Sequence, residues 1–174
     1  MFKRILVPFD ATPKSTRVLH KALSLAQKFK AKVTIVHILP YTDVKPITIS
    51  PNQLMGPGSL QDLPIAIPSK AEEEQLTKAA YVLQEAQSIS SEYKCEFKLA
   101  IRRGEIVKEI LKMAQKDYDL IVITGRKVPS IRKILLGGIA SRVVQDAPCS
   151  VLVIRIEKPK PDEVPSQPEN QPDK

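Results

Sequence analysis

The sequence predicts a doubly wound α/β domain, in which a five-stranded, mostly parallel sheet carries helices on both faces. Three observations support this prediction. Strand-like and helix-like patterns alternate five times along the chain, and the strand-like runs are apolar on both faces, as strands buried between two helical layers are. The length of 174 residues, with 43% hydrophobic and 26% charged positions, suits one sizeable core.

The first part of the chain supplies two strands and a helix. A short apolar run, KRILVPFD, predicts a buried strand over Lys3–Asp10. Thr12 then offers an N-cap oxygen, and Pro13 occupies the first helical position, where its missing N–H is no loss. Apolar residues spaced three and four apart continue this helix to about Lys30, and Lys32–Leu39 is the second expected strand.

The second part repeats the alternation. Ser69 opens a capping box, and the helix after it is expected to bury a stripe formed by Leu76, Ala79, Ala80, Leu83 and Ala86. Gly104 precedes another amphipathic helix, whose apolar face runs from Ile106 to Ala114. The remaining expected elements are strands over Cys95–Ile101, Asp119–Thr124 and Ser150–Arg155 and a short helix around Ile139–Val144.

Proline marks two stretches that we expect to be irregular. Six of the fifteen prolines lie in the loop 40–68 and five in the tail 156–174. The tail is polar and carries three Lys against five acidic residues, so it is expected to be disordered and acidic. The predicted organisation is an α/β domain over residues 1–155, followed by this tail.

The composition excludes several classes of function. The two cysteines, Cys95 and Cys149, and the two histidines, His20 and His37, lack metal-ligand spacing, so no metal site, disulfide framework or catalytic set is predicted. No apolar run is long enough to span a membrane and residues 1–4 do not open a signal peptide, which indicates a cytoplasmic protein. The net charge is −2 in the tail and +10 in the rest, which favours an anionic partner.

In doubly wound folds, ligands bind at the carboxyl ends of the strands, where the strand order reverses. The loops after Phe9 and Thr124 are therefore the predicted location of a site. Asp10 follows the first strand directly, where its carboxylate could bind a ribose hydroxyl, an adenine amino group or hydrated Mg²⁺. The alternative is that Asp10 only helps to cap the following helix.

The segment TGRKVPSIRKILLGGI combines glycines with cations just before a helix. Glycines allow backbone N–H groups to approach an anion closely, and a helix N-terminus favours negative charge. The residues concerned are Gly125, Gly137 and Gly138 and the cations Arg126, Lys127, Arg132 and Lys133. This combination predicts a phosphate-binding loop; the alternative is a solvated basic loop whose glycines only turn the chain.

Both ends of the domain resemble the universal stress protein family. The opening strand ILVPFD ends in an aspartate, and GRKVPSIRKILLGGIASRVVQDAPCSVLVIR is similar to the closing segment of the family. The resemblance extends from Phe2 to about Arg155. It implies the Rossmann-like fold that these proteins share with the adenine nucleotide alpha hydrolases.

The glycine motif of the nucleotide-binding members is incomplete in this chain. That motif reads Gly, two residues, Gly, nine residues, then Gly followed by Ser or Thr. Gly125 fits the first position, Val128 replaces the second glycine, and Gly138 is followed by Ile139 rather than a hydroxyl residue. The resemblance implies an adenosine end at Pro8, Asp10 and Ile38, and a phosphate end at Thr124, Gly125, Arg126, Lys127, Gly137 and Gly138.

The resemblance also implies a function: a non-catalytic, regulatory stress-response protein that binds adenine nucleotide, namely ATP with Mg²⁺. It implies a homodimer paired through the last strand at Val151, Leu152, Val153 and Ile154, which would otherwise leave an apolar edge bare. One alternative is a nucleotide-free dimer that binds an unidentified protein partner. A slow ATP hydrolase is less favoured because the P-loop pattern is absent, and nucleic-acid binding rests on net charge alone.

Overall fold

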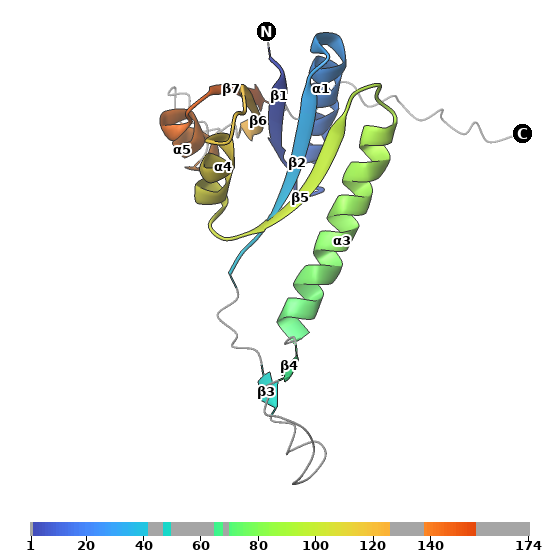
Figure 1. The fold of residues 1–174 in the computed structure, drawn as a ribbon, viewed down its shortest axis with the longest axis vertical. Coiled ribbons are helices and arrows are strands. Elements are labelled where there is room, and N and C mark those ends of the chain that lie inside the picture. The colour runs from blue at the N-terminus through green and yellow to red at the C-terminus, as the bar shows by residue number, and fades with distance from the viewer. Residues whose placement is uncertain (1, 42–46, 50–64, 68–69, 126–137, 156–174) are drawn as a thin grey trace, which may run out of the picture.

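The computed structural model describes residues 2–41, 47–49, 65–67, 70–125 and 138–155. Within these ranges, the strands of the main sheet alternate with helices as the sequence predicts (Figure 1). The strands are β1 (Arg4–Pro8), β2 (Lys32–Leu39), β3 (Ile47–Ile49), β4 (Ile65–Ile67), β5 (Phe97–Arg103), β6 (Leu120–Gly125) and β7 (Ser150–Arg155). The helices are α1 (Pro13–Phe29), α3 (Lys70–Ser91), α4 (Ile106–Ala114) and α5 (Gly138–Asp146).

The main sheet has five strands in the order β5-β2-β1-β6-β7, and all its pairs are parallel. This confirms the predicted doubly wound fold. The strand order reverses at β1, since β2 pairs with one of its edges and β6 with the other. The carboxyl ends of β1 and β6 are therefore neighbours, and a ligand site is expected beside them.

Two helical layers cover the sheet: α1 and α3 on one face, α4 and α5 on the other (Figure 1). Successive strand residues point to opposite faces, so Ile5 and Val7 join one core while Leu6, between them, joins the other. The largest buried side chains under α1 and α3 are Ile5, Leu19, Leu23 and Ile35. Leu6, Ile110 and Ile121 fill the core under α4 and α5.

Helix α1 begins as predicted. Thr12 is the N-cap, and its hydroxyl accepts a hydrogen bond from the backbone N–H of Ser15 at 3.3 Å. Pro13 is the first helical residue. The helix is capped at its other end by Lys30, which has a left-handed backbone (φ 54°, ψ 39°).

The expectation that all of 40–68 is irregular was wrong for six residues. β3 and β4 pair antiparallel, with Ile47 opposite Ile67 and Ile49 opposite Ile65. Proline cannot donate a ladder hydrogen bond, but none lies inside these three-residue segments, which are rich in β-branched residues. A pair this short fits between the prolines. The tail 156–174 lies outside the described residues.

The predicted apolar stripe of α3 was wrong at two positions. Leu76 is 49% exposed and Ala80 is also exposed, whereas Val82 and Ile89 are buried. Apolar residues on this helix fit more than one stripe at spacings of three and four, and contact with the sheet selects one of them. Ser69, the expected cap, lies outside the described residues. Strand β5 also starts at Phe97, two residues later than predicted.

Candidate functional site

A hydrogen-bonded turn links β1 to α1 and orients Asp10. Both the backbone N–H and the hydroxyl of Thr12 donate to Asp10 Oδ1, at 3.1 and 2.7 Å. Ala11, between them, has φ 57°, a left-handed conformation that costs a residue with a Cβ about 1 kcal/mol. Asp10 is thus not the N-cap itself; it holds Thr12, which is the N-cap.

The carboxyl group of Asp10 is poised to remain ionised. Partial burial raises its pKa, but hydrogen bonds with the hydroxyls of Ser15 and Thr12 outweigh that effect, and the net pKa is lowered from 3.8. The side chain still reaches solvent. Asp10 therefore presents a negative charge at the carboxyl end of β1, and a ligand hydroxyl or amino group could donate to it.

A cavity of about 150 Å³ lies beside this turn. Four of the predicted site residues, namely Pro8, Asp10, Ile38 and Thr124, line it together. The other residues that line it were not predicted from the sequence: Phe9, Ser15, Val36, His37, Ile106, Ile110, Ile123 and Ile139. The isoleucines of α4 and α5 give no local signal of this role, because their spacing is that of any buried helix face.

His37 fastens the end of β1 to β2. Its Nδ1 lies 2.9 Å from the carbonyl oxygen of Phe9, which only accepts, so Nδ1 carries the proton and donates. The backbone N–H of Phe9 donates to the carbonyl of Val36, also at 2.9 Å. These two bonds hold the residue that precedes Asp10. The sequence offered one signal for His37, which is that a polar residue stands within the apolar run IVHIL.

The two described glycines next to the basic loop have different environments. Gly125 is buried at the end of β6, where an added Cβ would lie only 2.7 Å from Cγ1 of Val153. Gly138 starts α5, and an added Cβ there would meet none of the described residues within 4 Å. Packing against β7 therefore explains Gly125 without a ligand. The predicted site residues Arg126, Lys127 and Gly137 lie outside the described residues.

Strand β7 is an edge of the main sheet, as the dimer prediction requires. Leu152 is 37% exposed, Val151 and Val153 are half-buried, and Ile154 is buried. The unpaired edge is therefore partly apolar, and its pairing with a second copy stays a prediction.

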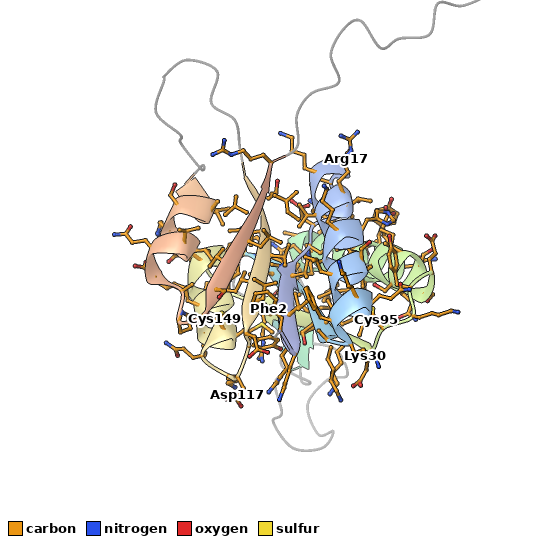
Figure 2. All side chains as sticks on the ribbon, turned by 90° about the horizontal axis from the view of Figure 1, so that it is seen from above. Phe2, Arg17, Lys30, Cys95, Asp117 and Cys149 are labelled. Carbon is orange, nitrogen blue, oxygen red and sulfur yellow. The ribbon has the colours of Figure 1, made fainter. Side chains whose placement is uncertain are left out.

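The described residues contain no group of three or more potential metal-ligating side chains. Cys95 and Cys149 are free and half-buried, and Figure 2 shows them on opposite sides of β1. Burial raises the pKa of both thiols, which disfavours the reactive thiolate. His20 does not line the cavity; its Nδ1 lies 2.8 Å from the hydroxyl of Tyr93.

Within the described ranges, no helix is both long and apolar enough to cross a membrane.

The universal stress protein family profile matches residues 1–155. The chain belongs to this family. Among curated relatives, a universal stress protein of Methanocaldococcus jannaschii is 27% identical over 161 residues, which cover 92% of this chain and 85% of that protein. The universal stress protein YxiE of Bacillus subtilis is 25% identical over 156 residues, covering 89% of this chain and all of that protein.

Solved structures of family members share the fold. UspA of Lactobacillus plantarum superposes with a TM-score of 0.66 at 22% identity, covering 88% of this chain and 98% of that one. The Archaeoglobus fulgidus protein in complex with dAMP has a TM-score of 0.58 at 22% identity, covering 88% and 97%. A member in complex with cAMP scores 0.61 at 17% identity, covering 88% and 97%. An Arabidopsis thaliana member with AMP bound scores 0.57 at 14% identity, covering 95% and 97%.

Proposed function

We propose that this universal stress protein binds an adenine nucleotide at the carboxyl ends of β1, β2 and β6 and acts in regulation rather than by turnover. The observation that carries the proposal is the cavity at the strand-order reversal, which combines apolar walls with the ionised carboxylate of Asp10. Relatives of the same fold have been solved with cAMP, dAMP and AMP. They support adenine nucleotide as the ligand class.

The walls suit the two halves of a nucleoside. Ile38, Ile106 and Ile110 offer an apolar surface on which a purine would be desolvated. Asp10, just after β1, would accept a hydrogen bond from a ribose hydroxyl. Its two bonds from Thr12 fix the carboxylate, so little side-chain entropy remains to be lost on binding.

The phosphates would extend toward the segment between Thr124 and Ile139. Both residues line the cavity, and the sequence between them contains Arg126 and Lys127. Cations and backbone N–H groups in that segment would hold the phosphates of ATP, and Mg²⁺ would accompany them. The described cavity, at about 150 Å³, is below the roughly 300–1,000 Å³ typical of ligand sites, so it would enclose only the nucleoside end.

We also propose that the protein is a cytoplasmic homodimer paired along β7. A half-exposed Leu152 on an unpaired edge favours this arrangement, because self-pairing would cover both the backbone groups and the side chain. Light scattering after size exclusion tests it. A mass of 19.4 kDa would exclude the dimer.

Calorimetric titration tests nucleotide binding. AMP, ADP and ATP, each with and without Mg²⁺, are titrated into protein first shown to carry no nucleotide. The Asp10→Asn variant keeps the acceptor oxygen toward Thr12 but loses the charge, and it should bind each nucleotide about tenfold more weakly. Asp146→Asn, an exposed charge change at the end of α5, is the matched control and should bind as the parent does. Equal affinities for both variants would exclude Asp10 as a ligand.

A nucleotide-free, protein-binding dimer is the second candidate. It is favoured by Gly125, which packing against Val153 explains, and by Val128 where the motif requires glycine. This candidate predicts no heat with any of the three nucleotides at millimolar concentration. It also predicts that the dimer forms without nucleotide.

A further inference from the structure

A second cavity, of about 680 Å³, lies at the opposite end of the sheet from the proposed nucleotide site. It is formed where β1, β2 and β5 begin and where α1 ends. Figure 2 labels Phe2 and Lys30, which both lie away from Arg17 near the start of α1. Because the sheet is parallel, its amino ends are separated from Asp10 by the length of the strands. The volume lies within the roughly 300–1,000 Å³ typical of small-molecule sites.

The lining of this cavity is strongly basic. Among its described residues are Lys3, Arg4, Lys30, Lys32 and Lys98 and one acidic residue, Glu96. Two of the five cations have acidic partners: Lys32 Nζ lies 2.9 Å from Glu96, and Arg4 lies 3.6 Å from Asp117. Within the described part of the chain, neither Lys30 nor Lys98 forms an ion pair. The cavity therefore carries uncompensated positive charge.

The same lining is aromatic. Phe2, Phe29 and Phe97 contribute to it, and each is only partly buried. Phe2 and Phe29 meet edge to face, with ring centroids 6.1 Å apart, which leaves ring surface available to a ligand. Three of the chain's four phenylalanines thus lie at this cavity, and their partly buried rings pack at the margin of the core under α1 and α3.

The backbone around the cavity is held in place. The N–H groups of Lys3 and Arg4 both donate to Asp119 Oδ2, at 2.7 and 2.8 Å. The N–H of Lys32 donates to the carbonyl of Lys3 at 2.8 Å, and that of Val33 donates to the carbonyl of Glu96 at 2.9 Å. The backbone positions from which the basic and aromatic side chains project are thus fixed.

Lys30, which lines this cavity, has a backbone conformation that is unusual for lysine. It ends α1 in the left-handed region, where helices usually place glycine because a Cβ is unfavourable there. A lysine at this position directs a cation to the cavity at a cost in backbone strain. A cation at the negative end of the helix also stabilises the helix, so the effect of Lys30 on stability has to be measured separately from its effect on binding.

We propose that this cavity binds a small amphipathic anion, with a carboxylate or phosphate head near Lys30 and Lys98 and an acyl or aryl body on the phenylalanines. A purely polar anion would leave the rings unused, and a neutral apolar ligand would leave the cations unused. The site is independent of the proposed nucleotide function. It would give the protein a second ligand on the opposite end of the sheet.

Dodecanoate below its micellar concentration is the probe, and its binding is followed by calorimetry and by amide NMR shifts. We expect shift changes at residues 2–4, 30–34 and 96–98, none at residues 8–10, and no loss of binding when AMP is present. Acetate and the neutral amphiphile dodecyl maltoside should bind at least about tenfold more weakly, since each lacks one half of the recognised chemistry.

The double variant Lys30→Gly/Lys98→Gln should bind dodecanoate about tenfold more weakly, with its urea midpoint retained because glycine relieves the strain at position 30. Lys21→Gln, an exposed change on α1 away from the cavity, is the matched control and should bind normally. Unchanged binding by the double variant, shifts confined to residues 8–10, or no binding at all would overturn the proposal. So would binding to anionic phosphatidylglycerol vesicles without binding to monomeric dodecanoate, because that result indicates a membrane surface instead.

Discussion

The contact between Gly125 and Val153 gives the sharpest test of how β6 and β7 pack. In Gly125→Ala, the new methyl group would lie 2.7 Å from Cγ1 of Val153, well inside normal van der Waals contact. Gly125 is buried, so the methyl cannot turn away into solvent. Either the valine or the strand pairing must shift.

The cost can be bounded from this geometry. Overpacking of a well-packed site costs about 1–3 kcal/mol, and replacing a strand glycine recovers roughly 0.5–1 kcal/mol through reduced unfolded-state entropy. We therefore expect Gly125→Ala to lower the free energy of unfolding by about 1–2 kcal/mol. For a chain of this length, that corresponds to a melting temperature lower by roughly 2–8 °C.

Urea denaturation of a double-mutant cycle measures this effect. In the Val153→Ala background the clashing methyl is absent, so adding Gly125→Ala should cost nothing, giving a coupling energy of about 1–2 kcal/mol. Gly138→Ala is the matched control, because an added Cβ there meets no atom of the described part of the chain within 4 Å, and it should stabilise by roughly 0.5 kcal/mol. A coupling energy near zero, or equal effects at both glycines, would refute the packing explanation for Gly125. All samples are compared at one protein concentration, since dimerisation would shift stability.

Three further predictions concern other parts of the fold. Ser90 is fully buried and its hydroxyl has no hydrogen-bond partner among the described residues, so Ser90→Ala should raise the free energy of unfolding in urea by about 1 kcal/mol. Ser91→Ala, which removes an exposed hydroxyl, should change it little. Backbone hydrogen bonds from Lys3 and Arg4 lower the pKa of Asp119 from its usual value of 3.8. The ionised Asp119 therefore stabilises the fold above pH 3.8, and this stabilisation is lost as the pH falls through the lowered pKa. Asp119→Asn should flatten the acid side of a curve of stability against pH, and an unchanged acid side would contradict this. In thermal unfolding, Val82→Ala should destabilise the protein by about 1–2 kcal/mol, because Val82 is buried, and the exposed Leu76→Ala by less than about 0.5 kcal/mol. A larger effect at Leu76 would support the apolar stripe first expected for α3.

The sequence predicted four of the twelve described residues that line the cavity at the candidate site. Asp10 follows an apolar strand and Thr124 lies at the end of another, so the rule that ligands lie at carboxyl ends selected them. Pro8 and Ile38 came from the resemblance to the family. His37 was considered only as a metal or acid–base group and was set aside. Its contact is with the carbonyl of Phe9, 28 positions away along the chain, and local patterns do not report such pairings.

The amino end of the sheet was not predicted at all. Phe2, Phe29 and Phe97 are far apart in sequence, and each fits an ordinary apolar position in its own element. Lys30 and Lys98 likewise looked like solvated surface charges. These residues share a cavity only because β1, β2 and β5 start at the same edge and α1 returns to it.

The sequence by itself determined the alternation of strands and helices, the cap of α1 and the position of Asp10 at a strand end. These features depend on periodicity, capping and turn chemistry, which act between residues close together in the chain. Only the tertiary structure decided which face of α3 is buried, why residue 125 is glycine and which side chains meet in each cavity. Those outcomes depend on contacts between distant segments, and the free energy of packing selects among several patterns that local sequence allows equally.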